Sequence, residues 1–202
     1  MFVQVIDGAG WPIWLLIFTS IIGLSIILER AWFLREELAI PKKLLSTSKS
    51  MINKNHIDEE ELKKLCSGNF LGEIFTTILQ NKNTDTAVIV VIVEQKATNI
   101  RYQLEKHLSY LTTVATVAPL LGLFGTIIGM VELFGSFTSG GSDVSVFAKG
   151  ISIALYNTAG GILVAVPAMI AYRYFRTKVD HILNEMEVHS NALVNSISSR
   201  RN

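Results

Sequence analysis

An uncharged stretch at residues 108–131, LSYLTTVATVAPLLGLFGTIIGMV, most constrains how this chain can fold. It exceeds the roughly 20 apolar residues that a helix needs to cross the hydrocarbon core of a bilayer. Small or hydroxylated residues recur along it at intervals of three and four, which places them on one helical face. These residues are Thr112, Ala115, Pro119, Gly122, Thr126 and Gly129. Since small residues let helices approach closely, the stretch predicts a membrane helix that packs against other helices.

Two further uncharged runs, residues 8–28 and 150–172, are also long enough to span a membrane. The first run lacks the basic segment and the cleavage site of a signal peptide, so we interpret it as a spanning helix. Basic residues follow the first and third runs, and the positive-inside rule therefore predicts a periplasmic N-terminus and a cytoplasmic C-terminus. These residues are Arg30, Arg35, Lys42 and Lys43 after the first run, and Arg173, Arg176 and Lys178 after the third.

The expected fold is all-α: a polytopic membrane protein with three transmembrane helices and a cytoplasmic domain of extended helices. We expect the first transmembrane helix within 1–30, a cytoplasmic helical domain at 31–107 that leads into the second span, and that span at 108–134. A periplasmic loop at 135–149, rich in Gly and Ser, is expected to precede the third transmembrane helix at 150–172 and a cytoplasmic C-terminal helix at 173–202.

The cytoplasmic segment has its own local signals. Pro41 is expected to end a continuation of the first helix, and Asp58 to cap a helix that begins with acidic residues. A short helix is predicted at 71–79 and a turn at 81–85. The β-branched run at 87–93 could be a strand by propensity, but it lacks a partner strand, so we favour one long helix with a buried N-terminal part.

The C-terminal segment at 174–197 has the pattern of an amphipathic helix. Its apolar stripe, which suits packing against other cytoplasmic helices, consists of Val179, Ile182, Met186, Leu193 and Ile197.

The third span repeats the design of the second. Its residues of the same three-and-four spacing are Ala154, Thr158, Gly161, Ala165, Ala168 and Tyr172. A single threonine in such a helix usually bonds its hydroxyl to a carbonyl one turn back. Two matched stripes instead favour a shared interior, where hydroxyls and the Asn157 amide could solvate an ion or a partner's ionised side chain. The candidate pathway residues are Thr112, Gly122, Thr126, Gly129, Ala154, Asn157, Thr158, Gly161 and Ala165.

The three apolar runs contain no Asp, Glu, Lys, Arg or His. A proton relay needs a titratable group at membrane depth, so a second chain should supply it. Glu132, at the outer end of the second span, could mark the mouth of a pathway or simply reach the interface. Pro119 and Pro167 are expected to kink their helices.

Several functional classes find no support in the chain. The four histidines and Cys66 lack metal-ligand spacing, and no nucleotide-binding or nucleophile motif is present, so we expect no metal, no cofactor and no enzymatic activity. A formal net charge of +1 without a basic, aromatic-interleaved patch gives no indication of nucleic-acid binding. The lone Cys66 cannot form an intrachain disulfide.

At the three spans the sequence resembles the ExbB/TolQ/MotA group of ion-driven motor subunits, most closely its ExbB branch. The matching segments are GWPIWLLIFTSIIGLSIILERAWFLR, ATVAPLLGLFGTIIGMVELF and ALYNTAGGILVAVPAMIAYRYF. The last two are specific, because APLLGLFGT followed by TAGG-x-x-VA-x-PA-x-x-AY is not a general membrane pattern. The order of spans matches too, so the resemblance covers nearly the whole chain.

The resemblance implies a homopentamer in the bacterial inner membrane, with a pore formed by the second and third spans. It implies that the pore holds single-span, ExbD-like partners, whose intramembrane Asp carries protons down the proton-motive force. It further implies that the motion passes to a TonB-like protein that energises outer-membrane uptake. The threonines that face the partner's Asp in this family correspond to Thr126 and Thr158.

The chain departs from the family pattern at two positions, one of which is Asn157, which is more polar than the small residue often found there. Many ExbB and TolQ chains carry a Glu five residues before the second Thr, where this chain has Ile153. A mechanism that needs that Glu does not transfer. Alternatives that stay open are a TolQ-like or other stator-type motor, coupling to Na⁺ instead of H⁺, and a membrane scaffold that conducts no ions.

Overall fold

The computed structural model describes residues 9–34, 69–137 and 144–201, and within these ranges every regular element is an α-helix. The helices are α2 (Ile13–Phe33), α6 (Phe70–Gln80), α7 (Thr86–Glu105), α8 (Leu108–Phe137) and α9 (Val144–Arg201). Three helical segments, Ile13–Phe33, Thr86–Gly135 and Phe147–Ser199, are long and apolar enough to cross a membrane. The prediction of an all-α chain with three transmembrane helices is confirmed.

The chain divides into two compact units. Unit 1 comprises Met1–Glu29 and His107–Tyr174, and unit 2 comprises Arg30–Lys106 and Phe175–Asn202. Helices α2 and α9 contribute residues to both units, so we describe each part with the unit to which it belongs.

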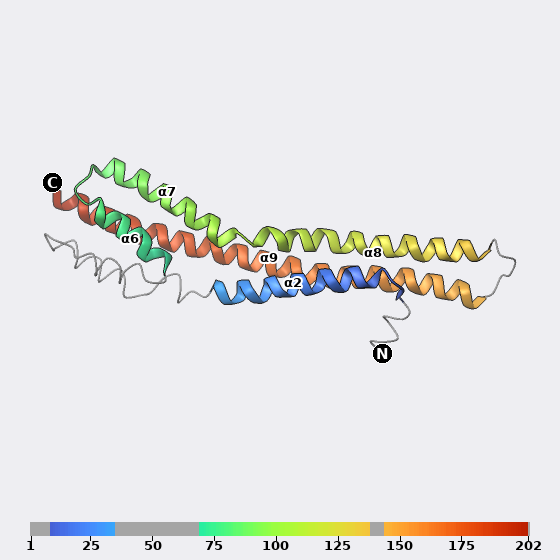
Figure 1. Ribbon diagram of the computed structural model, residues 1–202. Coiled ribbons are helices and arrows are strands. Elements are labelled where there is room, and N and C mark those ends of the chain that lie inside the picture. The colour runs from blue at the N-terminus through green and yellow to red at the C-terminus, as the bar shows by residue number, and fades with distance from the viewer. Residues whose placement is uncertain (1–8, 35–68, 138–143, 202) are drawn as a thin grey trace. The chain divides into compact units, whose positions relative to one another are not determined.

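In unit 1, α8 lies antiparallel to the first half of α9, and the N-terminal part of α2 packs against both (Figure 1). Leu16 of α2 shares a buried cluster with Ala118 of α8 and Ala165 of α9. The chain enters α2 through Gly10, whose φ of +70° is a conformation that L side chains rarely adopt. Many of the large apolar side chains on the outer sides of these helices are exposed, as expected of surfaces that meet lipid or other membrane helices.

Unit 2 is built from α6, α7 and the C-terminal part of α9. Asn69 is the N-cap of helix α6, and its side-chain oxygen accepts a hydrogen bond of 2.6 Å from the Gly72 backbone N–H. Its apolar residues from Leu71 to Leu79 are buried, and a 2.7 Å ion pair between Glu73 and Lys96 joins it to α7. The predicted short helix at 71–79 and the turn after it are therefore confirmed.

The ambiguous run at 87–93 is helical, as favoured from the sequence, because it lies inside α7. The prediction that this N-terminal part of the helix is buried was wrong. Ile89 is buried, but Val88 and Val91 are 45% and 52% exposed. One face of a helix meets the core, and a run of consecutive apolar residues necessarily turns some of them away from it.

Helix α9 continues for 58 residues, so the third span and the C-terminal helix form one element, not two. Helix α8 extends to Phe137 and α9 begins at Val144, and the loop between them is therefore shorter than the predicted 135–149. All five residues of the apolar stripe predicted at 174–197 are buried, which confirms its role in packing. Pro119 and Pro167 lie inside continuous helices. The expectations for Pro41, Asp58 and Cys66 lie outside the described residues.

Arg30 is a buried cation in unit 2, with 2% of its surface exposed. Its guanidinium donates a 3.1 Å hydrogen bond to the carbonyl of Leu104 and lies 4.8 Å from the ring centroid of Phe33. Leu104 is in the last turn of α7, where carbonyls lack partners within the helix and a positive charge is favourable.

We therefore expect Arg30→Met to destabilise the C-terminal end of α7 by about 2 kcal/mol, the typical value of a charged hydrogen bond. Hydrogen exchange of the amides at 100–105 in the full chain measures this effect. Arg101→Met, which removes an exposed cation from the same helix, is the matched control and should leave those amides protected. Equal deprotection in both variants would contradict the assigned role of Arg30.

Candidate functional site

The contact between α8 and α9 in unit 1 is made by glycines. A Cβ added to Gly161 would lie 2.7 Å from the Ala118 carbonyl oxygen, and one added to Gly122 would lie 2.8 Å from the Asn157 carbonyl oxygen. Further along, a Cβ on Gly129 would lie 2.8 Å from the Gly150 carbonyl oxygen. These distances are too short for any side chain, so the two backbones touch over this length.

The contact uses most of the small residues that the sequence singled out for a shared interior. Gly122, Gly129, Gly161 and Ala165 are buried, and Ala154 and Thr112 are partly buried. Their close approach joins two helices of the same chain. Of the predicted stripes, Thr126 and Thr158 are less buried than the glycines of the contact.

Two threonines flank the contact, one on each helix. Thr126 follows Gly125 and is partly buried, and its hydroxyl donates a 2.6 Å hydrogen bond to the Leu123 carbonyl. This bond to its own helix is the ordinary behaviour of a membrane threonine. Thr158 follows Asn157 and is exposed. Both side chains therefore border a surface that other chains or solvent can reach.

Asn157 differs from these threonines because its side chain is fully buried. Its Nδ2 donates hydrogen bonds of 2.7 Å to the Ala9 carbonyl and 2.8 Å to the Ile153 carbonyl. Its Oδ1 is buried and has no hydrogen-bond partner among the described residues. Within this chain the amide thus joins segments instead of lining an open surface.

The segment before α2 completes this region, and the sequence did not single it out. Ala9 is fully buried, and Trp11 makes an edge-to-face contact with Phe124 of α8, with ring centroids 5.9 Å apart. Ile153, at 3% exposed, lies beside Gly10. The local signal was Gly10 before Trp11 and Pro12, since a glycine can adopt the positive φ that this turn requires.

The charged groups of unit 1 lie towards the ends of its helices. Glu132, the proposed mouth residue, is exposed near the end of α8. At the other end of α8, His107 Nδ1 lies 3.1 Å from Glu29 Oε2, and both side chains are partly exposed. Because no carboxylate lies along the apolar part of either helix, α8 and α9 offer an ion hydroxyls and carbonyls but no proton carrier of their own.

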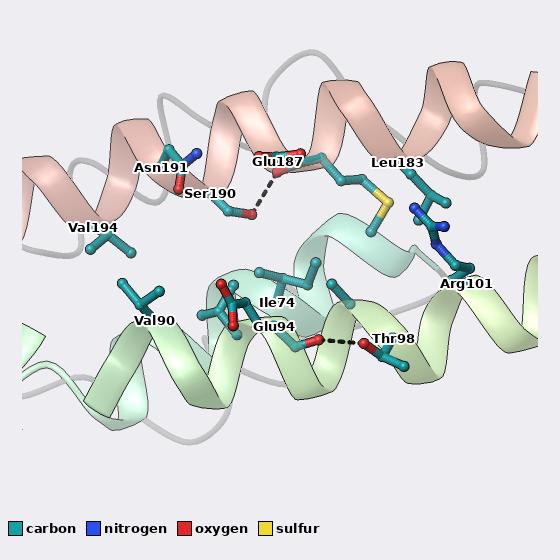
Figure 2. Close-up of a pocket in the computed structure, with 13 residues that line it drawn as sticks. Ile74, Val90, Glu94, Thr98, Arg101, Leu183, Glu187, Ser190, Asn191 and Val194 are labelled. Atoms are coloured by element: carbon teal, nitrogen blue, oxygen red, sulfur yellow. Dashed lines mark hydrogen bonds between the residues drawn. The ribbon is translucent and has the colours of Figure 1, made fainter. Parts of the chain in front are cut away.

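Unit 2 contains a groove of about 610 Å³ between α7 and the C-terminal part of α9, shown in Figure 2. Its walls combine apolar residues with Glu94, Arg101 and Glu187. The hydroxyls of Thr98 and Ser190 are bonded to carbonyls of their own helices, at 2.9 and 2.6 Å. These hydroxyls do not converge on a ligand position, and the α8–α9 contact remains the candidate site.

Comparison with known proteins points to the same helices. Residues 66–188 match the MotA/TolQ/ExbB proton channel family. The biopolymer transport protein exbB1 of Vibrio cholerae is 36% identical over 89 residues, which cover 43% of this chain and 39% of that protein.

Two further relatives extend the comparison. A putative ExbB-like biopolymer transport protein of Synechocystis is 28% identical over 78% of this chain and 64% of its own length. The Tol-Pal system protein TolQ of Haemophilus influenzae is 32% identical over 52% of this chain and 48% of its own length. Each match spans less than two thirds of the relative concerned.

Proposed function

The chain belongs to the MotA/TolQ/ExbB proton channel family, and from this premise we propose that it is the membrane subunit of an ion-driven motor. In this proposal the α8–α9 pair forms the wall of a pore in the bacterial inner membrane, with the N-terminus in the periplasm and the C-terminus in the cytoplasm. Proton flow along the pore is converted into mechanical work for TonB-dependent uptake through the outer membrane.

The observation that carries the proposal is the pairing of a tight glycine contact with two threonines at its edge. The contact makes α8 and the first half of α9 one rigid wall, because their backbones touch. Thr126 and Thr158 border that wall, where a hydroxyl can stabilise an ionised carboxylate. Because the spans are uncharged, the titrating carboxylate must belong to another chain. Thr126 and Thr158 then stabilise that carboxylate by hydrogen bonding.

We further propose that five copies of the chain surround the helices of a smaller, single-span partner that carries an intramembrane Asp. The large exposed apolar side chains on α8 and α9, such as Leu120 and Leu163 at 63% and 74%, provide surface for contacts between copies and with lipid. Gly122, Gly129, Ala154, Gly161 and Ala165 support the wall from inside, Thr112 continues its edge, and Glu132 stands at the outer mouth.

A second candidate role is a TolQ-like motor for envelope maintenance. The TolQ proteins of Haemophilus influenzae and Pseudomonas aeruginosa are 32% and 38% identical to parts of this chain, values similar to those of the ExbB proteins. Rescue of a strain that lacks its TonB motor, but not of one that lacks its Tol motor, would favour the ExbB-like role. The opposite pattern would favour the TolQ-like role.

Native mass spectrometry of the chain, extracted together with the product of the neighbouring gene, tests the proposed assembly. We expect five copies of this chain with a smaller single-span protein. Reconstituted in liposomes, the complex should carry protons, and a Na⁺ flux that continues when the proton gradient is collapsed would instead indicate sodium coupling. A monomer or dimer alone, or a pentamer that recruits no second chain, would overturn the motor and favour a scaffold.

A further inference from the structure

Three segments of unit 1 meet at the Asn157 side chain. One of its two donated hydrogen bonds stays within α9, where Ile153 is one turn away. The other reaches the carbonyl of Ala9, 148 residues earlier in the sequence. Ala9 directly precedes Gly10, so its carbonyl lies next to the positive-φ residue and the turn that lead into α2. A single buried amide thus ties the start of α2 to the middle of α9.

Helix α8 supplies the third side of this junction through Gly125. A Cβ added to Gly125 would lie 2.9 Å from Asn157 Oδ1 and closer still to the Asn157 side-chain carbons. The amide therefore fills the notch that the glycine leaves in α8. Any rotation of α9 about its axis would drive Asn157 out of the notch and break its bond to Ala9.

Packing alone does not account for an amide at this position, because the buried Oδ1 has no hydrogen-bond partner in the described part of the chain. Burial of a polar atom without a hydrogen bond costs free energy, and an apolar side chain of the same shape would avoid that cost. Packing alone would therefore favour leucine at this position. The feature that leucine cannot reproduce is the N–H donor that holds the Ala9 carbonyl.

Both threonines at the edge of the wall adjoin this junction. Thr158 follows Asn157, and Thr126 follows Gly125. Consecutive side chains on a helix point about 100° apart, so fixing Asn157 inward fixes the direction of Thr158 as well. The contact that holds α9 is therefore made by Asn157, directly beside the exposed Thr158.

We propose that Asn157 is a positioning residue that sets the rotation of α9, and with it the direction of Thr158, by clamping the Ala9 carbonyl. The inference rests on the proposed function only in the use that it assigns to Thr158. The clamp itself is a property of unit 1.

A nitroxide spin label at position 158 tests the clamp in the purified full-length chain, reconstituted in liposomes of phosphatidylethanolamine and phosphatidylglycerol. The label is attached through Thr158→Cys in a Cys66→Ser background. Collision rates with oxygen and with a water-soluble nickel chelate report whether the label faces lipid or water. A second label at Leu163→Cys, roughly 140° round the helix, distinguishes rotation from local unfolding.

With Asn157 present we expect one spectral component at position 158. Asn157→Leu, which keeps the branching at Cγ and the number of heavy atoms but removes the donor, should raise the population of a second orientation by about fivefold, the effect of one lost hydrogen bond. The label at 163 should shift in the opposite sense, towards water if 158 turns towards lipid. An unchanged spectrum at 158 would overturn the inference, as would equal loosening at both positions.

Asn157→Ala removes the donor without adding any atom to the packed junction, and it serves if Asn157→Leu does not fold. We expect the second orientation to appear in this variant as well, and a wild-type spectrum would overturn the inference. If the label at position 158 collides only with oxygen when Asn157 is present, Thr158 faces lipid and the proposed pore is contradicted. The comparison with Asn157→Leu would still test whether Asn157 positions α9.

Discussion

Gly161→Ala is expected to abolish assembly of the chain, whereas the same change at the adjacent Gly160 is expected to be tolerated. At Gly161 the new methyl would lie 2.7 Å from the Ala118 carbonyl oxygen and 3.1 Å from the Gly122 Cα. Both are backbone atoms of α8, so relief requires the helices to move apart. At Gly160 the nearest atoms are the flexible ends of Leu16 and Ile13, at 3.4 and 3.5 Å.

The two variants are matched in composition and in helix propensity, which alanine improves over glycine by about 1 kcal/mol. At Gly161 this gain is outweighed, because overpacking typically costs about 1–3 kcal/mol and the displacement also disturbs Gly122 and the neighbouring contacts along the helices. Native mass spectrometry and the yield of detergent-stable oligomer measure the difference. Normal assembly of the Gly161 variant, or equal loss in both, would contradict the close α8–α9 contact as the basis of the wall.

Much of the fold could be predicted from the sequence because it depends on local signals. The three spans follow from uncharged runs of sufficient length, and α7 follows from the lack of a partner for a strand at 87–93. The buried stripe of α9 in unit 2 follows from helical periodicity, since Val179 and Ile182 are both 0% exposed. The loop between α8 and α9 was overestimated, because Gly and Ser weaken a helix without forbidding it.

The candidate site was predictable only in part, because periodicity identifies a face but not what the face meets. The small stripes predict close helix contacts, yet the pairing of Gly122 with Gly161 inside one chain requires tertiary structure. The bond from Asn157 to Ala9 joins residues 148 positions apart, and no local pattern encodes such a pair. Thr126 and Thr158 stand out in the sequence, but their different exposures depend on the rotation of each helix.

Thr158 is exposed and Thr126 is partly buried. We therefore expect Thr158→Val to reduce ion-driven transport strongly, and more than Thr126→Val does. Valine keeps the shape and β-branching of threonine, so the helix is preserved while the hydroxyl is lost. A hydrogen bond to a charged group contributes about 1.5–3 kcal/mol, which corresponds to a loss of roughly tenfold to a hundredfold in rate. Thr126 directs its hydroxyl proton to the Leu123 carbonyl and has less to offer a carboxylate.

Proton-motive-force-dependent uptake in cells that coexpress the partner measures this ranking. Thr113→Val is the matched control, because Thr113 is exposed on α8 and its hydroxyl donates to the Ser109 carbonyl of its own helix. We expect full activity in that variant and unchanged oligomers in all three. Unchanged uptake with Thr158→Val would remove the hydroxyl from the mechanism, and the carbonyls along the wall would then have to stabilise the partner's carboxylate alone. An equal loss with Thr113→Val would instead show that the effect comes from a threonine-to-valine change in any membrane helix and not from the position of Thr158.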